Sequence, residues 1–159
     1  MRKNVVKLAL VSLALVVAPA AVPAANNPAP AVYSASDGLA AGGYDVTAYF
    51  TDGKAVRGSA RHEVMLQGVT WRFVSAESKA RFQANPSAYA PQFGGYCAWA
   101  VSQGYIASGD PKQWKIVDGK LYLNFNERAK ELWEADLAAA IERGNANWPT
   151  VLTHNQDNP

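Results

Sequence analysis

Apolar and polar residues alternate in two pairs of neighbouring segments, and each pair is joined by a two-residue link that ends in glycine. The pairs are 62–66 with 69–74 around Gln67-Gly68, and 114–117 with 121–125 around Asp118-Gly119. Alternation is typical of strands with one buried face, and a short Gly-containing link favours a tight hairpin turn. The pattern therefore predicts two β-hairpins. Residues 44–50, rich in aromatic and β-branched side chains, predict a further strand.

Helix signals lie between and after these strands. Ser and Asn are good N-caps, Pro suits the first helical position, and Gly often ends a helix. The predicted helices are 76–84 after Ser75, 86–89 beginning at Pro86, 95–103, and 127–143 between Asn126 and Gly144. No strand–helix–strand rhythm and no internal repeat is apparent. We therefore predict an α+β fold, a small single domain with two β-hairpins packed against several helices.

The N-terminal segment has the features of an export signal. Arg2, Lys3 and Lys7 begin the chain, an apolar run covers 8–18, and small residues follow. This order is typical of a Sec-type signal peptide. We therefore predict a signal peptide at 1–24 and a periplasmic or secreted product. A membrane anchor is the less favoured alternative, because no second apolar stretch of spanning length follows.

Composition divides the remainder of the chain. Residues 25–43 are rich in Ala, Pro, Asn and Ser and predict a disordered linker. Residues 44–148 contain nearly all the aromatic side chains and predict the folded domain, and 149–159 predict a flexible tail.

Charge excludes some partners. The full chain carries 15 Lys and Arg against 13 Asp and Glu. Without the three basic residues of the predicted signal peptide, 12 basic residues face 13 acidic ones, a net charge of −1. The rest of the chain has no Lys/Arg cluster. We therefore expect binding neither to nucleic acid nor to an anionic membrane.

Cys97 is the only cysteine, and it follows Gly94-Gly95-Tyr96. No intramolecular disulfide can form, so an exported thiol of this kind is buried and inert, paired with another chain, or chemically used. The two glycines allow a tight turn into the helix predicted at 95–103. That turn places Cys97 in the first helical turn, where unpaired N–H groups favour a thiolate. Cys97 is therefore the first candidate for a chemical site.

Several segments together resemble the YHS domain family. The family's strand–helix pattern is matched by 68–75 (GVTWRFVS), 82–86 (FQANP) and Tyr89. An exported single-domain branch of the family is resembled by 44–50 (YDVTAYF), 89–98 (YAPQFGGYCA) and 114–124 (WKIVDGKLYLN). The resemblance covers nearly all of 44–148.

The resemblance implies a non-enzymatic binding module that handles a soft metal ion, copper first. In the exported branch, selenocysteine can occupy the position that Cys97 matches, which suits redox chemistry or soft-metal ligation. Residues 61–63 read Arg-His-Glu instead of the tripeptide that names the family, and 74–78 lack the cysteines that many metal-linked members carry there. A multi-thiolate site is therefore not carried over.

Cys97, Met65 and His62 are the soft ligands that the domain offers to Cu(I). Met65 as core filler and His62 as a solvated strand-end residue are the alternatives for those two side chains. Two other functions stay open: a thiol redox protein in which an external thiol resolves oxidised Cys97, and a protein-interaction module without chemistry. A Cys–His catalytic pair is not favoured, because within the domain only His62 could act as the base.

Aromatic residues also suggest a small ligand pocket. Its candidate lining residues are Tyr44, Tyr96, Trp99 and Trp114, with Asp45 orienting a polar group of the ligand. The alternative is that these side chains belong to the core.

Overall fold

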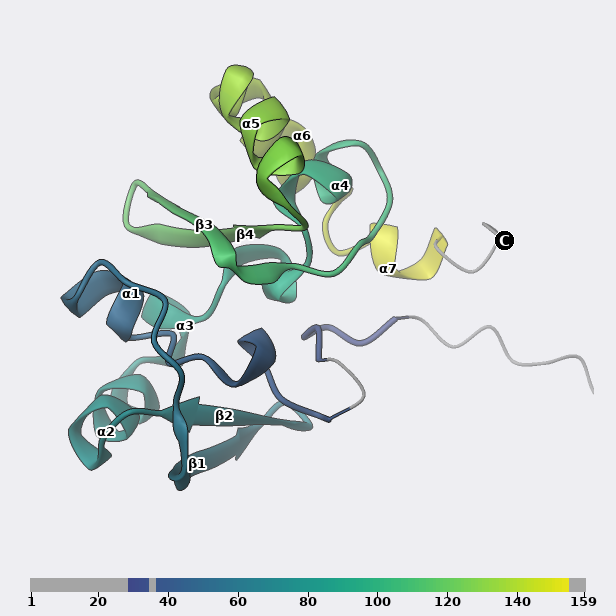
Figure 1. Cartoon of the computed structure of the whole chain (residues 1–159). Coiled ribbons are helices and arrows are strands. Elements are labelled where there is room, and N and C mark those ends of the chain that lie inside the picture. Colours follow the sequence, from purple (N-terminus) through teal and green to yellow (C-terminus); the bar gives the residue numbers. More distant parts are fainter. Residues whose placement is uncertain (1–28, 35–36, 155–159) are drawn as a thin grey trace, which may run out of the picture.

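Both predicted hairpins are present in the computed structural model, which describes residues 29–34 and 37–154 (Figure 1). β1 (Ser59–Leu66) pairs antiparallel with β2 (Val69–Phe73), and β3 (Asp110–Val117) pairs antiparallel with β4 (Lys120–Asn124). Both residues of each turn have positive φ, which is the type I′ geometry that such hairpins prefer. The hairpins form two separate two-stranded sheets, so the predicted α+β class with a single small domain is confirmed.

Two of three short helices begin at the residues that the sequence indicated, whereas the helix predicted over 95–103 covers only 98–102. In α2 (Ala76–Ala84) the Ser75 hydroxyl accepts the Ser78 N–H at 3.1 Å. α3 (Pro86–Tyr89) has its proline at the first position, and α4 (Ala98–Ser102) follows Cys97. Among the described residues, none of the helices combines the length and apolarity needed to cross a membrane.

The strand predicted at 44–50 is absent. Only Tyr44 makes a bridge, to Arg57, and the chain then turns into α1 (Ala48–Thr51). The cause is Asp45, whose carboxylate accepts the Thr47 N–H at 2.8 Å and bends the backbone out of the extended form.

The helix predicted over 127–143 is two helices, α5 (Glu127–Ala135) and α6 (Leu137–Asn147), which separate at Asp136. Gly144 lies inside α6 instead of ending it. Its role is close packing, because a Cβ there would come within 2.6 Å of the Phe93 ring. Glycine is thus required by a neighbouring side chain, which the local sequence does not reveal.

Residues 29–34, which we call the strap, pack on the domain although they were predicted as linker. Val32 is buried, the Tyr33 N–H donates to the Gly94 carbonyl at 2.8 Å, and the Tyr96 hydroxyl donates to the Pro30 carbonyl at 2.9 Å. The Ala29 N–H donates to the Leu152 carbonyl at 2.9 Å. A few apolar and aromatic side chains therefore order a segment whose composition resembled that of a linker.

Residues that follow the strap, and part of the predicted tail, also pack on the domain. Leu39, Ala40 and Ala41 are buried, with Ala41 opening the 3-10 turn η1 (Ala41–Gly43). In the predicted tail, α7 (Val151–His154) buries Val151 and Leu152. The predicted signal peptide, the linker residues 25–28 and 35–36, and the tail residues 155–159 lie outside the described residues.

The structure contains an internal repeat that the sequence did not reveal. The first half runs from η1 to α2 (residues 41–84), and the second runs from the 3-10 turn η2 (Gln92–Gly95) to α5 (residues 92–135). Each half contains a turn, a short helix, a hairpin and a nine-residue helix. Figure 1 shows β1, β2 and α2 at one end of the molecule and α5 at the other, with β3 and β4 between them.

Strand register shows how closely the halves agree. In the first hairpin, Ser59 pairs with Phe73 and the regular ladder resumes at Glu63–Arg72; in the second, Asp110 pairs with Asn124 and the ladder resumes at Trp114–Leu123. Every one of these residues is 51 positions from its counterpart, so both first strands carry the same irregularity at the same place. The two halves therefore share one supersecondary arrangement.

Tyr49 joins the two halves. Its hydroxyl donates to the Pro111 carbonyl at 2.8 Å, and its ring meets Trp114 edge-on at 5.0 Å between centroids. Burial in this contact raises the pKa of Tyr49 above its usual range.

Candidate functional site around Cys97

Cys97 is the N-cap residue of α4, one position before the first helical turn in which it was predicted. Its Sγ accepts the Ala100 N–H at 3.5 Å, so the sulfur takes the place that a serine or aspartate oxygen takes in common caps. The backbone reaches this position through Gly94 and Gly95, both with positive φ. A Cβ on Gly94 would collide with the Ala31 carbonyl of the strap, so glycine is needed there for contact as well as for conformation.

Asn124, at the end of β4, is the side chain that faces Cys97. Its Oδ1 accepts the Trp99 N–H at 3.1 Å and lies 3.8 Å from the Cys97 Sγ, whose S–H donates to it. Asn124 is 0 % exposed, and its Nδ2 has no hydrogen-bond partner in the described part of the chain. The thiol therefore shares a buried polar contact with an amide that keeps one donor unpaired.

The surroundings of this pair are small and apolar. Cys97 is 1 % exposed and clusters with Ala100 and Ala129, with Trp99 and Ala107 packed against them. An oxidant or a metal ion can therefore reach the sulfur only when α4 or its neighbours open locally.

The other two proposed copper ligands lie elsewhere. Met65 and His62 are on β1, with Met65 74 % exposed and His62 half-buried. Figure 1 shows β1 and α4 at opposite ends of the molecule. The structure thus does not bring His62, Met65 and Cys97 together. Within residues 29–34 and 37–154, no group of three or more His, Cys, Asp or Glu side chains could hold a metal ion.

The five residues proposed for a ligand pocket are spread over both halves. The Arg57 guanidinium lies over the Tyr44 ring, with its carbon 4.9 Å from the ring centroid. Trp114 packs on Tyr49. Asp45 is buried and hydrogen-bonded to its own chain.

In the second half, Tyr96 packs on Tyr33 of the strap at 5.3 Å between centroids, and burial raises its pKa. Trp99 is half-buried beside Cys97. Three grooves in the described residues, one of them about 310 Å³ between the strap, η2 and Trp148, are lined by other side chains. None of these three grooves collects the five candidates.

Sequence reasoning found Cys97 but missed Asn124. The two residues are 27 positions apart, and Asn124 occupies an ordinary strand-end position in the sequence. One signal was available: Gly-Gly-Tyr occurs twice, at 42–44 and at 94–96, and is followed first by Asp45 and then by Cys97.

Comparisons with models of known families, with curated proteins and with solved structures give no match. The resemblance to YHS domains therefore stays a prediction, and functional inference starts from the geometry around Cys97.

Proposed function

We propose that this protein is a non-enzymatic thiol redox protein in which a peroxide oxidises Cys97. The observation that carries the proposal is the fully buried Asn124 amide, which contacts the only thiol while its Nδ2 has no partner among residues 29–34 and 37–154. An unsatisfied buried donor costs about 1–3 kcal/mol, and a redox or catalytic role is one of the explanations for such a group in a native protein. An oxygen atom added to the sulfur would supply the missing acceptor.

The chemistry needs one sulfur and one small oxidant. The Cys97 thiol and a peroxide ROOH give the sulfenic acid Cys–SOH and ROH; the O–O bond breaks, an S–O bond forms, and the sulfur loses two electrons. Because the chain has no second cysteine, an external thiol resolves the product, forming a mixed disulfide and water. Hydrogen peroxide is uncharged and little larger than water, so a small local opening suffices for its entry.

Hydrogen peroxide should add one oxygen atom to Cys97 in the folded mature protein, as measured by intact mass and peptide mapping. A sulfenic-acid trap added together with the peroxide should capture this product. Cys97→Ser is the matched control and should show no such change. The same treatment in denaturant gives the rate for a fully exposed thiol. A thiol that reacts in denaturant and stays reduced indefinitely in the folded protein would be a buried, inert cysteine, and the proposal would fail.

Soft-metal binding is a second proposal, favoured by the single thiolate that Cys97 can offer; the exposed thioether of Met65 is the rival site for such an ion. Because these two sulfurs lie on separate elements, copper at Cys97 would need a further ligand from outside the chain. Titration with Cu(I) under reducing conditions should then show about one ion per chain. Cys97→Ala should abolish this binding and Met65→Leu should leave it intact; the reverse pattern would move the site to β1.

A further inference from the structure

The internal repeat gives Cys97 a counterpart, Asp45, which lies 52 instead of 51 positions earlier because the loop that precedes the hairpin is one residue longer in the first half. Each follows a turn of three positive-φ residues that ends in Gly-Gly, with φ of 48°, 56° and 77° in the first half and 53°, 60° and 83° in the second. Each also donates its backbone N–H across the following loop, Asp45 to Val56 and Cys97 to Ala107, at 2.9 Å in both cases. The two side chains therefore occupy equivalent places, where a short helix begins beside the end of a hairpin.

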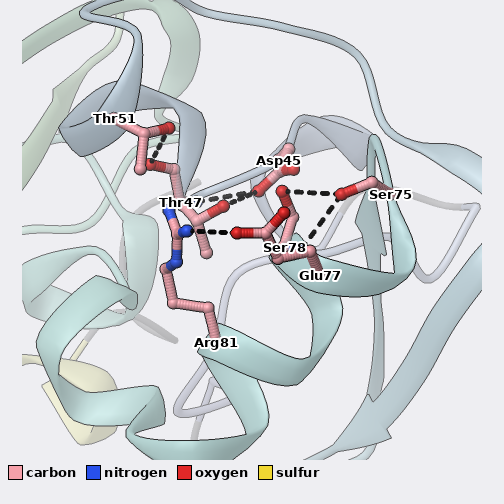
Figure 2. Close-up of polar contacts among 7 residues, drawn as sticks. All are labelled: Asp45, Thr47, Thr51, Ser75, Glu77, Ser78 and Arg81. Atoms are coloured by element: carbon pink, nitrogen blue, oxygen red, sulfur yellow. Dashed lines mark hydrogen bonds and ion pairs between the residues drawn. The ribbon is translucent and has the colours of Figure 1, made fainter.

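In the first half, the carboxylate of Asp45 fills this place completely. One oxygen accepts the Thr47 N–H at 2.8 Å and the Thr47 hydroxyl at 2.7 Å, and the other accepts the Val74 N–H just after β2 at 2.9 Å. Figure 2 shows Asp45 turned toward Thr47, beside the start of α2. The carboxylate, 0 % exposed, thus ties the start of α1 to the end of the hairpin.

In the second half, the same place lacks an anionic group. The N–H of Trp99, which corresponds to Thr47, is accepted by Asn124 Oδ1 at 3.1 Å, because the Cys97 side chain carries no oxygen. Asn124 itself corresponds to the apolar Phe73, so the amide is an addition of this half. Its Nδ2 is a buried donor without a partner among the described residues, and Oδ1 of the same amide lies 3.8 Å from the sulfur. The site resembles the Asp45 site with the two carboxylate oxygens removed.

We propose that Cys97 is a modification site whose product, cysteine sulfinate, takes up the role that the carboxylate has at Asp45. This step rests on the proposed function. A second peroxide converts the sulfenic acid Cys–SOH to the sulfinic acid Cys–SO₂H and ROH, with loss of two further electrons from sulfur, and the acid then releases its proton to solvent. Sulfinate and carboxylate share a charge of −1 and two acceptor oxygens.

The hydrogen bonds can then be rearranged without an unpaired donor. A sulfinate oxygen accepts the Trp99 N–H, as Asp45 accepts the Thr47 N–H, and the Asn124 amide turns its Nδ2 toward the sulfinate. An anion buried without partners destabilises a fold, whereas an anion that accepts several N–H bonds is favoured. Oxidation of Cys97 should therefore stabilise the protein, which is the opposite of what oxidation of an ordinary core thiol does.

Cys97→Asp tests the geometry without any oxidant. Its Tm should equal or exceed that of the wild type and should lie at least about 4 °C above that of Cys97→Asn, which has the same shape without the charge. In an Asn124→Leu background, where the donor is missing, the advantage of Asp over Asn should shrink. A Cys97→Asp protein that fails to fold, or that is less stable than Cys97→Asn, would overturn the proposal.

Peroxide treatment of the wild type tests the modification itself. In excess peroxide without an external thiol, peptide mapping should show two added oxygen atoms on Cys97, together with a rise in Tm that Cys97→Ser does not show. Oxidation that stops at the sulfenic acid or a mixed disulfide would keep the proposed function and overturn the sulfinate. A thiol that never oxidises when folded would overturn both, even if Cys97→Asp were stable.

Discussion

Replacing Asp45 by alanine should lower the free energy of unfolding by about 3–5 kcal/mol, the largest loss that we expect from removing a single side-chain group. The carboxylate is fully buried and accepts three hydrogen bonds. Without it the N–H groups of Thr47 and Val74 lose their partners away from water. Chemical denaturation, followed by tryptophan fluorescence, measures the loss directly.

Asp52→Ala is the matched control, because Asp52 is an exposed aspartate at the end of α1. Its effect should stay within about 0.5 kcal/mol. Asp45→Asn adds a second comparison: it keeps one acceptor for Thr47 but presents an amide to the Val74 N–H. Its stability should fall between those of the wild type and Asp45→Ala. A loss below about 1 kcal/mol for Asp45→Ala would show that the carboxylate is dispensable.

The elements predicted from sequence are those fixed by chemistry within a few residues. The Gln67-Gly68 and Asp118-Gly119 turns determined both hairpins, and the Ser75 cap determined the start of α2. The errors arose where a distant group decides the outcome. The sequence predicts that Gly144 ends a helix. In the structure, glycine is needed there because the ring of Phe93, from another part of the chain, leaves no room for a Cβ.

The repeat was hidden for a related reason. Residues shared by the two halves are mainly those that the backbone requires, such as the Gly-Gly-Tyr turns and the pair Gly58 and Gly109. Side chains that fill the core differ: Phe82 in the first half corresponds to Trp133 in the second, and both are fully buried. Packing needs only an apolar residue of suitable size at each place, so the fold can repeat while the sequence diverges.

The candidate site was also only partly predictable from the sequence, because one of its two residues comes from a distant part of the chain. Its lone thiol and its glycine-rich approach were visible in the sequence, and both positioned Cys97 close to where the structure has it. The partner amide of Asn124 reaches Cys97 only through the pairing of β3 with β4 and the bridge between Cys97 and Leu123. Contacts of this kind depend on tertiary structure. The hydrogen-bond partners of Cys97 therefore could not be predicted from the distances between residues along the sequence.

Gly109→Ala should destabilise the protein by about 3 kcal/mol or more, and it should make the Cys97 thiol accessible. A Cβ at this position would overlap the Gly95 carbonyl oxygen and lie 2.9 Å from the Leu123 Cβ. Backbone atoms cannot move aside as a flexible side chain can, so the strand that carries Leu123 must separate from the turn before Cys97. We expect a lower Tm and faster alkylation of Cys97 under native conditions.

Two variants separate local opening from a general loss of stability. Gly119→Asn changes a glycine with open space around it in a turn that tolerates asparagine, so it should leave both Tm and alkylation nearly unchanged. Gly58→Ala makes the equivalent overlap in the first half, where a Cβ would lie 2.6 Å from the Phe73 nitrogen. It should lower Tm comparably while Cys97 stays protected. Equal alkylation rates in Gly58→Ala and Gly109→Ala would mean that Cys97 becomes accessible only by global unfolding, and peroxide would then have no local route to the thiol.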